Sequence, residues 1–192
     1  MAAQDKQLKK FQYEKLPLII SKLELTGSTK KQLQNYQLIT QQLDYLITKE
    51  QYDQAIRLLA LGLPKQEVVW WSYLTVKQYD QAMNDIKAQN ALQFIENWVR
   101  EPTEEKRRLA EHSVAALTLF SPIAWVAQAI FMSGGSIAPI DQFQVMPDEF
   151  ACAHCAATAM ILVKAKSQIE LTDIKRILRV GLHIAMGGNG KV

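Results

Sequence analysis

The residues best suited to chemistry in this chain form one short cluster, Cys152-Ala153-His154-Cys155. A Cys-x-x-Cys pair near a helix start can serve as a redox site, because the helix dipole lowers the pKa of a thiol. Thiolate and imidazole groups also bind zinc, so Cys152, His154 and Cys155 are candidate metal ligands. The cluster therefore raises two chemical hypotheses, a thiol-dependent site and a metal site.

Neither hypothesis finds support elsewhere in the sequence. A redox pair of this type normally follows a strand, and no strand is predicted before it. A structural zinc site needs four ligands, and the further histidines are His112 and His183. We expect instead a tightly packed helix in which the cysteines serve as small hydrophobic residues beside alanines. No metal and no cofactor is predicted.

Other groups that suggest chemistry have simpler explanations. The glycine-rich segment 187–191 superficially looks like a phosphate-binding loop, but such a loop needs a strand before it and a helix after it. A flexible tail is expected there. Glu104 and Glu105 are explained by a helix start, where acidic residues complement the dipole. No Ser/His/Asp arrangement can be assembled, so no catalytic residue is predicted and we expect the protein not to be an enzyme.

The tryptophans point to binding rather than to catalysis. Trp70 and Trp71 are adjacent, so on a helix their side chains diverge by about 100° and cannot share one face. One can pack inward while the other lies at the edge of the core or in a groove. Packing of both in the core is the favoured interpretation, but tryptophan is also enriched at binding hot spots. Both residues are therefore candidates for a protein-binding surface.

Composition excludes several classes of function. The net charge of +3 combines 22 basic with 19 acidic residues, which is too balanced for a nucleic-acid-binding protein. Two cysteines in this length suggest a reducing compartment, and no cleavable apolar segment follows the polar N-terminus. We therefore expect a cytoplasmic protein.

One uncharged stretch tests whether the chain crosses a membrane. No charged residue lies between His112 and Asp141, and residues 115–132 are mostly apolar. A membrane-spanning helix needs about 20 such residues. Ser121-Pro122 reads as a new helix start within this stretch, so two short buried helices are predicted in place of a span. A membrane-inserting effector or toxin that uses residues 114–132 remains a third hypothesis.

Helix start and stop residues recur along the chain and predict an all-α fold, with no confident strand. Capping boxes are expected at Thr29 with Gln32 and at Thr48 with Gln51, and Thr172 is the expected cap of the last helix. The pattern predicts about eight helices, packed as stacked hairpins in a bundle or a short solenoid-like array. Expected helices lie before Gly27, over 29–46, 51–61, 64–79 and 88–99, from Thr103, over 121–131, from Pro147 and over 172–186.

Two regions are predicted along the chain. Residues 1–47 form an N-terminal helical extension that could be a docking element, and residues 48–192 form the helical core domain. A loop rich in glycine and proline is expected from Ser133 to about Met146. Its Gly134 and Gly135 permit a sharp turn and Pro139 stiffens the exit, so these three residues join Trp70 and Trp71 as candidate protein-binding residues.

Several motifs resemble those of a bacterial family catalogued as a domain of unknown function. Leu63-Pro64-Lys65-Gln66-Glu67-Val68-Val69-Trp70-Trp71 is similar to its first signature, and the segment 133–139, Ser-Gly-Gly-Ser-Ile-Ala-Pro, to its second. Weaker similarities are Trp98-Val99 with Pro102 and Arg107, Ala124-Trp125, and the segment 182–188. The resemblance extends from about residue 50 to 188, and the cysteine pair within this range is not part of its motifs.

The resemblance implies a context rather than a mechanism. Members of the family are often encoded near bacterial secretion genes, those of type VI in particular, and no catalytic residues are assigned to them. It therefore implies a non-catalytic accessory or adaptor protein that binds secretion-system components or effectors. The alternative function is a metal- or thiol-dependent protein built on Cys152, His154 and Cys155.

Overall fold

The structure is a computed structural model of the whole chain, and it describes residues 8–80, 85–115, 117, 118, 120–167 and 169–192. These residues form an all-α fold without strands, as the sequence predicts. One 3-10 helix and ten α-helices are present among them, where about eight helices were expected. In chain order they are η1 (Tyr13–Lys15), α1 (Leu16–Lys22), α2 (Gly27–Gln34), α3 (Ile39–Thr48), α4 (Tyr52–Gly62), α5 (Lys65–Tyr79), α6 (Ile86–Arg100), α7 (Glu104–Ala115), α8 (Pro122–Phe131), α9 (Ala151–Lys166) and α10 (Leu171–Ala185).

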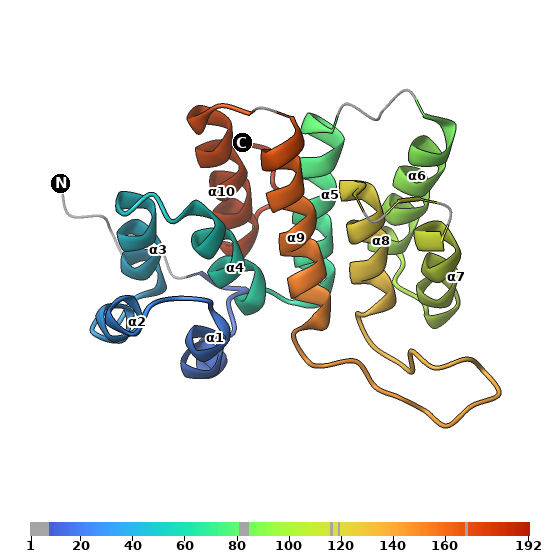
Figure 1. Cartoon of the computed structure of the whole chain (residues 1–192), viewed down its shortest axis with the longest axis horizontal. Coiled ribbons are helices and arrows are strands. Elements are labelled where there is room, and N and C mark those ends of the chain that lie inside the picture. Colours follow the sequence, from blue (N-terminus) through green and yellow to red (C-terminus); the bar gives the residue numbers. More distant parts are fainter. Residues whose placement is uncertain (1–7, 81–84, 116, 119, 168) are drawn as a thin grey trace.

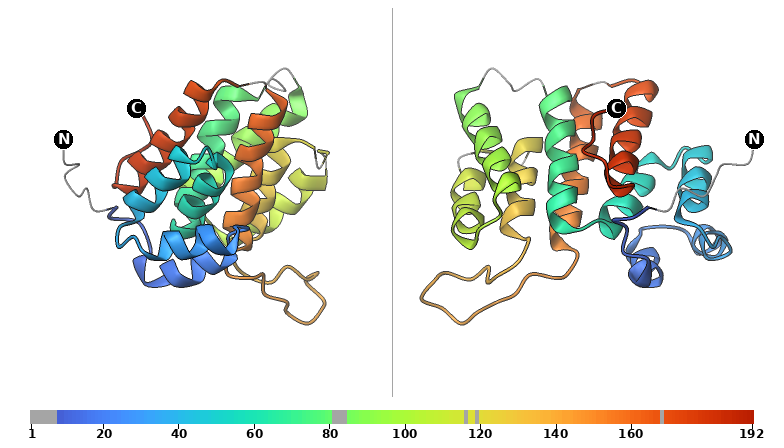
Figure 2. Two further views of the ribbon diagram at one scale, coloured as in Figure 1. Left: turned by 60° about the vertical axis from the view of Figure 1, so that its left-hand side comes forward. Right: turned by 180° about the vertical axis from the view of Figure 1, so that it is seen from behind.

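Helix α9 lies at the centre of the arrangement. It packs against α4, α5 and α8, and α10 packs against α4 and α5. Helices α6 and α7 lie beyond α8 on one side, and α1, α2 and α3 lie beyond α4 on the other (Figure 1). Buried alanines line the facing surfaces of α8 and α9, which lets these two helices approach closely. The loop between α8 and α9 protrudes from the bundle in every view (Figure 2).

The first helix boundaries differ from the sequence prediction. Gly27 begins α2 instead of ending the first helix, and the hydroxyl of Thr26 caps α2 by accepting a hydrogen bond from the backbone of Thr29. The single helix expected over 29–46 is two helices, α2 and α3. At the break, the buried side-chain amide of Gln42 donates to the carbonyls of Leu33 (3.0 Å) and Tyr36 (3.3 Å). These bonds satisfy backbone carbonyls at the end of α2, so the helix can end there. The apolar residues keep their helical spacing across this break, and the spacing alone therefore predicts one helix.

Three further helices also begin at residues other than those that the sequence predicts. Thr48 ends α3, and α4 follows Gln51 without a side-chain cap. The last helix is capped by a reciprocal box of Glu170 and Asp173 and not by Thr172. Helix α9 begins at Ala151, four residues after Pro147. The predicted starts at Pro64, Thr103 and Ser121-Pro122 are confirmed.

The uncharged stretch forms α8 and the end of α7, with the break before Pro122 that the sequence indicates. Within the described residues, no helix combines the length and the apolar character that a membrane crossing requires.

The N-terminal segment contacts the core through apolar side chains. Leu8 and Phe11 are buried in the same hydrophobic cluster as α4, α5, α8, α9 and α10. The ring of Phe11 lies directly against Gly62, where a Cβ atom would come within 2.0 Å of it. The backbone of Lys10 also donates to the carbonyl of Ala185 at 2.9 Å. A docking role for residues 1–47 stays a prediction.

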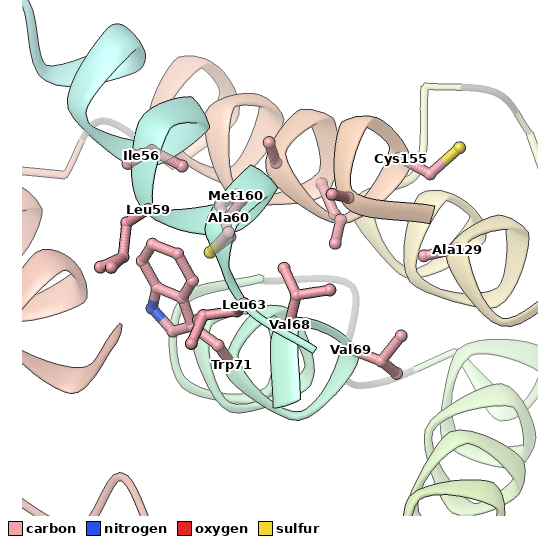
Figure 3. Close-up of a cluster of buried hydrophobic side chains, with 14 of the residues drawn as sticks. Ile56, Leu59, Ala60, Leu63, Val68, Val69, Trp71, Ala129, Cys155 and Met160 are labelled. Carbon is pink, nitrogen blue, oxygen red and sulfur yellow. The ribbon is translucent and has the colours of Figure 1, made fainter. Parts of the chain in front are cut away.

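Trp71 occupies the centre of the core between α4, α5 and α10 (Figure 3). Its indole N–H donates to the carbonyl of Ile177 at 2.9 Å, so its one polar group is satisfied. Gly181, one turn further along α10, lies against the indole, and a Cβ atom there would lie 2.6 Å from the indole and 2.8 Å from Leu59. The absence of a side chain at position 181 therefore makes room for the tryptophan.

Replacing Gly181 with alanine should lower the free energy of unfolding by about 1–2 kcal/mol. The overlap with the indole costs about 1–3 kcal/mol, and the better helix propensity of alanine returns up to about 1 kcal/mol. The matched control is Gly27→Ala, because nothing lies within 4 Å of a Cβ atom at that position. Urea unfolding followed by circular dichroism measures both variants. Equal stabilities for the two would contradict this account of the core.

Candidate functional site

The adjacent tryptophans of α5 diverge as their spacing predicts. Trp71 is fully buried, whereas Trp70 is partly exposed and stacks on Tyr73, with ring centroids 5.1 Å apart and an interplanar angle of 20°. The indole N–H of Trp70 donates to the backbone carbonyl of Asn189 at 2.9 Å. The favoured expectation that both tryptophans pack in the core therefore holds only for Trp71. Trp70 lies at the edge of the core, beside a cleft.

This cleft, named here the Trp70 cleft, has a volume of about 710 Å³. Helices α5 and α6, the segment after α10 and one N-terminal residue converge to form it. A volume of this size is typical of small-molecule and peptide sites. Its lining consists of Lys10, Gln66, Glu67, Trp70, Glu96, Val99, Arg100, His183, Gly187, Gly188 and Asn189.

The charges in the Trp70 cleft largely pair with one another. Lys10 contacts Glu67 at 2.5 Å, and Glu96 pairs with Arg100 on the same helix. The hydroxyl of Tyr73 donates to Glu96 at 2.5 Å. This hydrogen bond lowers the pKa of the Glu96 carboxyl, while burial is the main cause that raises the pKa of Tyr73. Glu96 is thereby held ionised at neutral pH, which does not suit a general acid.

The glycine-rich C-terminal segment forms one wall of the cleft and is not the flexible tail that the sequence suggests. Gly188 packs against the imidazole of His183, where a Cβ atom would come within 2.3 Å of the ring. Gly190 is buried, and a Cβ atom there would lie 2.6 Å from Leu74. Gly187 and Gly190 have φ values of 100° and 83°, which favour glycine. A phosphate-binding geometry is absent, since α10 precedes these glycines and no described helix follows them.

A second surface is the loop between α8 and α9, residues 133–150, named here the α8–α9 loop. Its base is fixed by two arginines of α7. Arg107, with 3% of its surface exposed, pairs with Glu104 at 2.6 Å and donates to the carbonyls of Phe131 and Ser136. Arg108 donates to the carbonyls of Ser136 and Ala138, at 2.9 and 2.8 Å. The two guanidinium groups thus hold the start of the loop through backbone oxygens.

The two segments of the chain that meet at the base of the loop are also hydrogen-bonded to each other. The hydroxyl of Ser136 accepts hydrogen bonds from the backbone N–H groups of Ala138 and Val145, both at 3.1 Å. The backbone N–H of Ile137 donates to the carbonyl of Val145 at 2.8 Å. These bonds close the loop at its base, so residues between Ala138 and Val145 form a defined tip.

The predicted loop residues Gly134, Gly135 and Pro139 have different roles. Gly135 has a φ of 61° and lies against the anchor, where a Cβ atom would come within 2.8 Å of Arg107 and 2.9 Å of Glu104. Nothing lies within 4 Å of a Cβ atom at Gly134. Pro139 is exposed at the start of the tip. Gly135 is therefore part of the anchor, which the glycine-rich pattern indicated without identifying its arginine partners.

The tip of the α8–α9 loop exposes large apolar side chains that were not among the predicted site residues. Phe143 is 96% exposed and Ile140 88%, while Val145 and Met146, at the base of the loop, are exposed by 51% and 62%. Ile140 and Phe143 lie three residues apart and are almost fully exposed, which makes the tip a candidate interaction surface. The signal available in the sequence was four large apolar residues in a segment bounded by Pro139 and Pro147, without helical spacing.

The structure does not bring the two surfaces together. A cleft of about 350 Å³ behind the α8–α9 loop is lined by Glu104, Arg108 and loop residues, and it shares no residue with the Trp70 cleft. The predicted binding residues therefore divide into two groups. Trp70 belongs to one surface, Gly134, Gly135 and Pro139 belong to the other, and Trp71 belongs to the core.

The cysteine cluster lies in the packed part of α9, and its three candidate ligands do not converge. Cys152 and Cys155 are buried, and burial raises the pKa of their thiols to about 12 and about 11. His154 is half-buried, and burial followed by the nearby charge of Arg57 lowers its pKa. Among the described residues, no group of three or more His, Cys, Asp or Glu side chains is arranged to hold a metal ion. The geometry favours the packing role expected for the cysteines.

The fold and these surfaces define an all-α protein with an anchored, apolar-tipped loop and a tryptophan-lined cleft. Residues 42–185 match a family described as a family of unknown function (DUF6931), and the chain belongs to this family. The match includes α5, the α8–α9 loop and the whole of α10. No curated protein and no solved structure matches the chain.

Replacing Gly135 with alanine should loosen the α8–α9 loop, because a Cβ atom at this position displaces Arg107 and strains the backbone. Such a positive φ costs a residue with a side chain about 1 kcal/mol or more. Gly134→Ala is the matched control. Hydrogen exchange of residues 136–146 should rise several-fold in Gly135→Ala and stay unchanged in Gly134→Ala. Equal exchange in the two variants would contradict the anchoring role.

The two cysteines should react with alkylating reagents only at high pH or after unfolding. The thiolate is the reactive form, and an ordinary thiol is about half ionised at pH 8.5. With a pKa of about 11, Cys155 has less than about 1% thiolate at that pH, and Cys152 has less still. Mass spectrometry after iodoacetamide treatment, with and without urea, measures this. Rapid labelling of the native protein at pH 8 would restore the thiol hypothesis.

Proposed function

We propose that the protein is a non-catalytic accessory or adaptor protein of a bacterial secretion system, and that it acts in the cytoplasm through protein–protein contacts. The observation that carries the proposal is the α8–α9 loop, whose base is fixed by Arg107 and Arg108 while its tip exposes Ile140 and Phe143. An ordered base lowers the entropic cost of binding, and exposed apolar side chains supply the area to be buried. This combination suits a preformed protein-docking element.

The secretion context comes from the resemblance of the Leu63–Trp71 and Ser133–Pro139 segments to family motifs. The Trp70 cleft provides a second surface for a partner, whose lining shares no residue with the cleft behind the loop, and two separate surfaces suit an adaptor. Paired charges in that cleft and buried, protonated thiols in α9 make the alternative metal- or thiol-dependent function the less favoured one.

Affinity capture from the cells that encode the protein tests this proposal. Tagged wild-type protein should recover a secretion-system component or effector, identified by mass spectrometry. A loop variant with Ile140→Ser and Phe143→Ser should recover at least several-fold less, because it removes the exposed apolar side chains. Phe120→Ser is the matched control, since Phe120 is 79% exposed outside the loop. Recovery of no secretion-system component by the wild-type protein would refute the adaptor function.

A further inference from the structure

The tip of the α8–α9 loop combines apolar side chains with an acidic charge balance. Residues 133–150 contain Asp141, Asp148 and Glu149 and no lysine or arginine. Glu149 pairs with Lys15 at 2.6 Å, and the carboxylate of Asp148 accepts from the backbone of Phe150. Asp141 lies between Ile140 and Phe143 in sequence, and it takes part in no ion pair among the described residues. The tip thus presents two prominent apolar side chains beside one uncompensated negative charge.

The two arginines at the base of the loop are already engaged by the anchor. Arg107 is occupied by Glu104 and by the carbonyls of Phe131 and Ser136. Arg108 is occupied by the carbonyls of Ser136 and Ala138. Both guanidinium groups also lie over the ring of Phe131, at 5.3 and 5.8 Å. The charge of Asp141 is therefore available to a partner.

From this arrangement we infer that the loop tip is a docking element for a different protein, which has an apolar groove flanked by lysine or arginine side chains. Phe143 and Ile140 enter the groove and Asp141 meets its basic edge. The inference rests on the proposed adaptor function and specifies the chemistry of the partner. Charge complementarity of this kind raises the association rate and fixes the register of docking.

A lipid surface is the less suitable occupant. Membrane-binding loops and helices join apolar side chains to lysine and arginine residues, which meet anionic headgroups. The α8–α9 loop has the opposite charge balance, and an anionic bilayer would repel Asp141.

A second copy of the chain is the other alternative occupant. The Trp70 cleft has charged walls in which Lys10 and Arg100 are already paired with Glu67 and Glu96, so it provides no free basic edge. The large apolar side chains exposed outside the loop lie on separate elements, for example Leu18 on α1, Leu109 on α7 and Leu171 on α10. This scattered distribution favours a different protein over a second copy as the occupant.

The first experiment places a photo-reactive benzoylphenylalanine at position 143 of the full chain, in the cells that encode the protein. The same replacement at position 120 is the control. Position 143 should yield an adduct with one other protein, and the cross-linked peptide should map to an apolar groove beside lysine or arginine. An adduct only with a second copy of the chain, or equal adducts from both positions, would overturn the inference.

The second experiment measures affinity for the purified protein that was cross-linked. Phe143→Ala should weaken binding about thirtyfold, as for a hot-spot residue. Asp141→Lys should weaken it about tenfold and reverse the salt dependence of the association rate, while Asp141→Asn should have a smaller effect and remove that dependence. Phe120→Ala should leave the affinity unchanged. These positions are exposed, so thermal unfolding should match the wild type and separates lost docking from lost fold.

Two further measurements test the other occupants with the wild-type chain. Sedimentation with vesicles of phosphatidylglycerol and phosphatidylcholine should leave the protein in the supernatant, and sedimentation equilibrium should show no loop-dependent dimer. Vesicle binding that Phe143→Ala abolishes would overturn the inference in favour of a lipid.

If a secretion component binds the loop variants as well as the wild type, the docking inference fails while the adaptor function stands. If the cross-linked protein fits this chemistry but belongs to no secretion system, the docking inference stands and the secretion-adaptor function fails.

Discussion

The burial of Trp71 is the constraint on which the arrangement of the other elements depends. Its indole fills the space between α4, α5 and α10, and Gly181 of α10 leaves room for it. Because the two tryptophans diverge by about 100° on a helix, inward packing of Trp71 turns Trp70 outward. The carbonyl of Asn189 then satisfies the Trp70 indole, and this bond seats the C-terminal segment on α5. The Trp70 cleft is thus a consequence of how the core is packed.

The α8–α9 loop depends on a second buried group, the guanidinium of Arg107. Burying a cation costs several kcal/mol unless charges and hydrogen bonds replace its hydration. Glu104 supplies the opposite charge, and the carbonyls of Phe131 and Ser136 accept from the remaining donors. A lysine has no planar fork of donors with which to satisfy these partners at once. The arginine therefore connects α7, the end of α8 and the loop in one contact, and Gly135 leaves space for it.

The sequence predicted the features that depend on neighbours along the chain. The all-α class, the starts of α5, α7 and α8 and the divergence of the two tryptophans follow from local patterns. The break between α2 and α3 was missed because the side chain that satisfies it, Gln42, lies several residues further on and is buried by tertiary packing. The packed C-terminal segment was missed for the same reason, since its partner Trp70 is far away in sequence.

The candidate site also divides into features that local sequence predicts and features that depend on residues far away in the chain. The glycine and proline pattern of residues 133–139 predicted a defined turn, and the turn is present. The pattern could not identify the anchor, because the contacts of Arg107 and Arg108 with loop carbonyls span 28 to 30 residues. It also could not separate buried from exposed apolar residues in the rest of the loop. Whether these apolar residues are buried or exposed depends on the direction in which the anchor holds the loop, and this direction is away from the bundle.

Exposed apolar side chains at the loop tip are difficult to explain by the stability of the chain alone. Burying a side chain such as that of Ile140 or Phe143 contributes about 1.5–3 kcal/mol, and the isolated chain forgoes this gain. The bonds of Arg107 and Arg108 hold the start of the loop, and the tip projects away from the bundle (Figure 1). A partner of the proposed kind would recover this gain by burying the tip. Two or three such side chains contribute about 3–9 kcal/mol, which is comparable to the entropic cost of association of about 4–15 kcal/mol. A loop of this kind consequently suits reversible docking better than a permanent assembly.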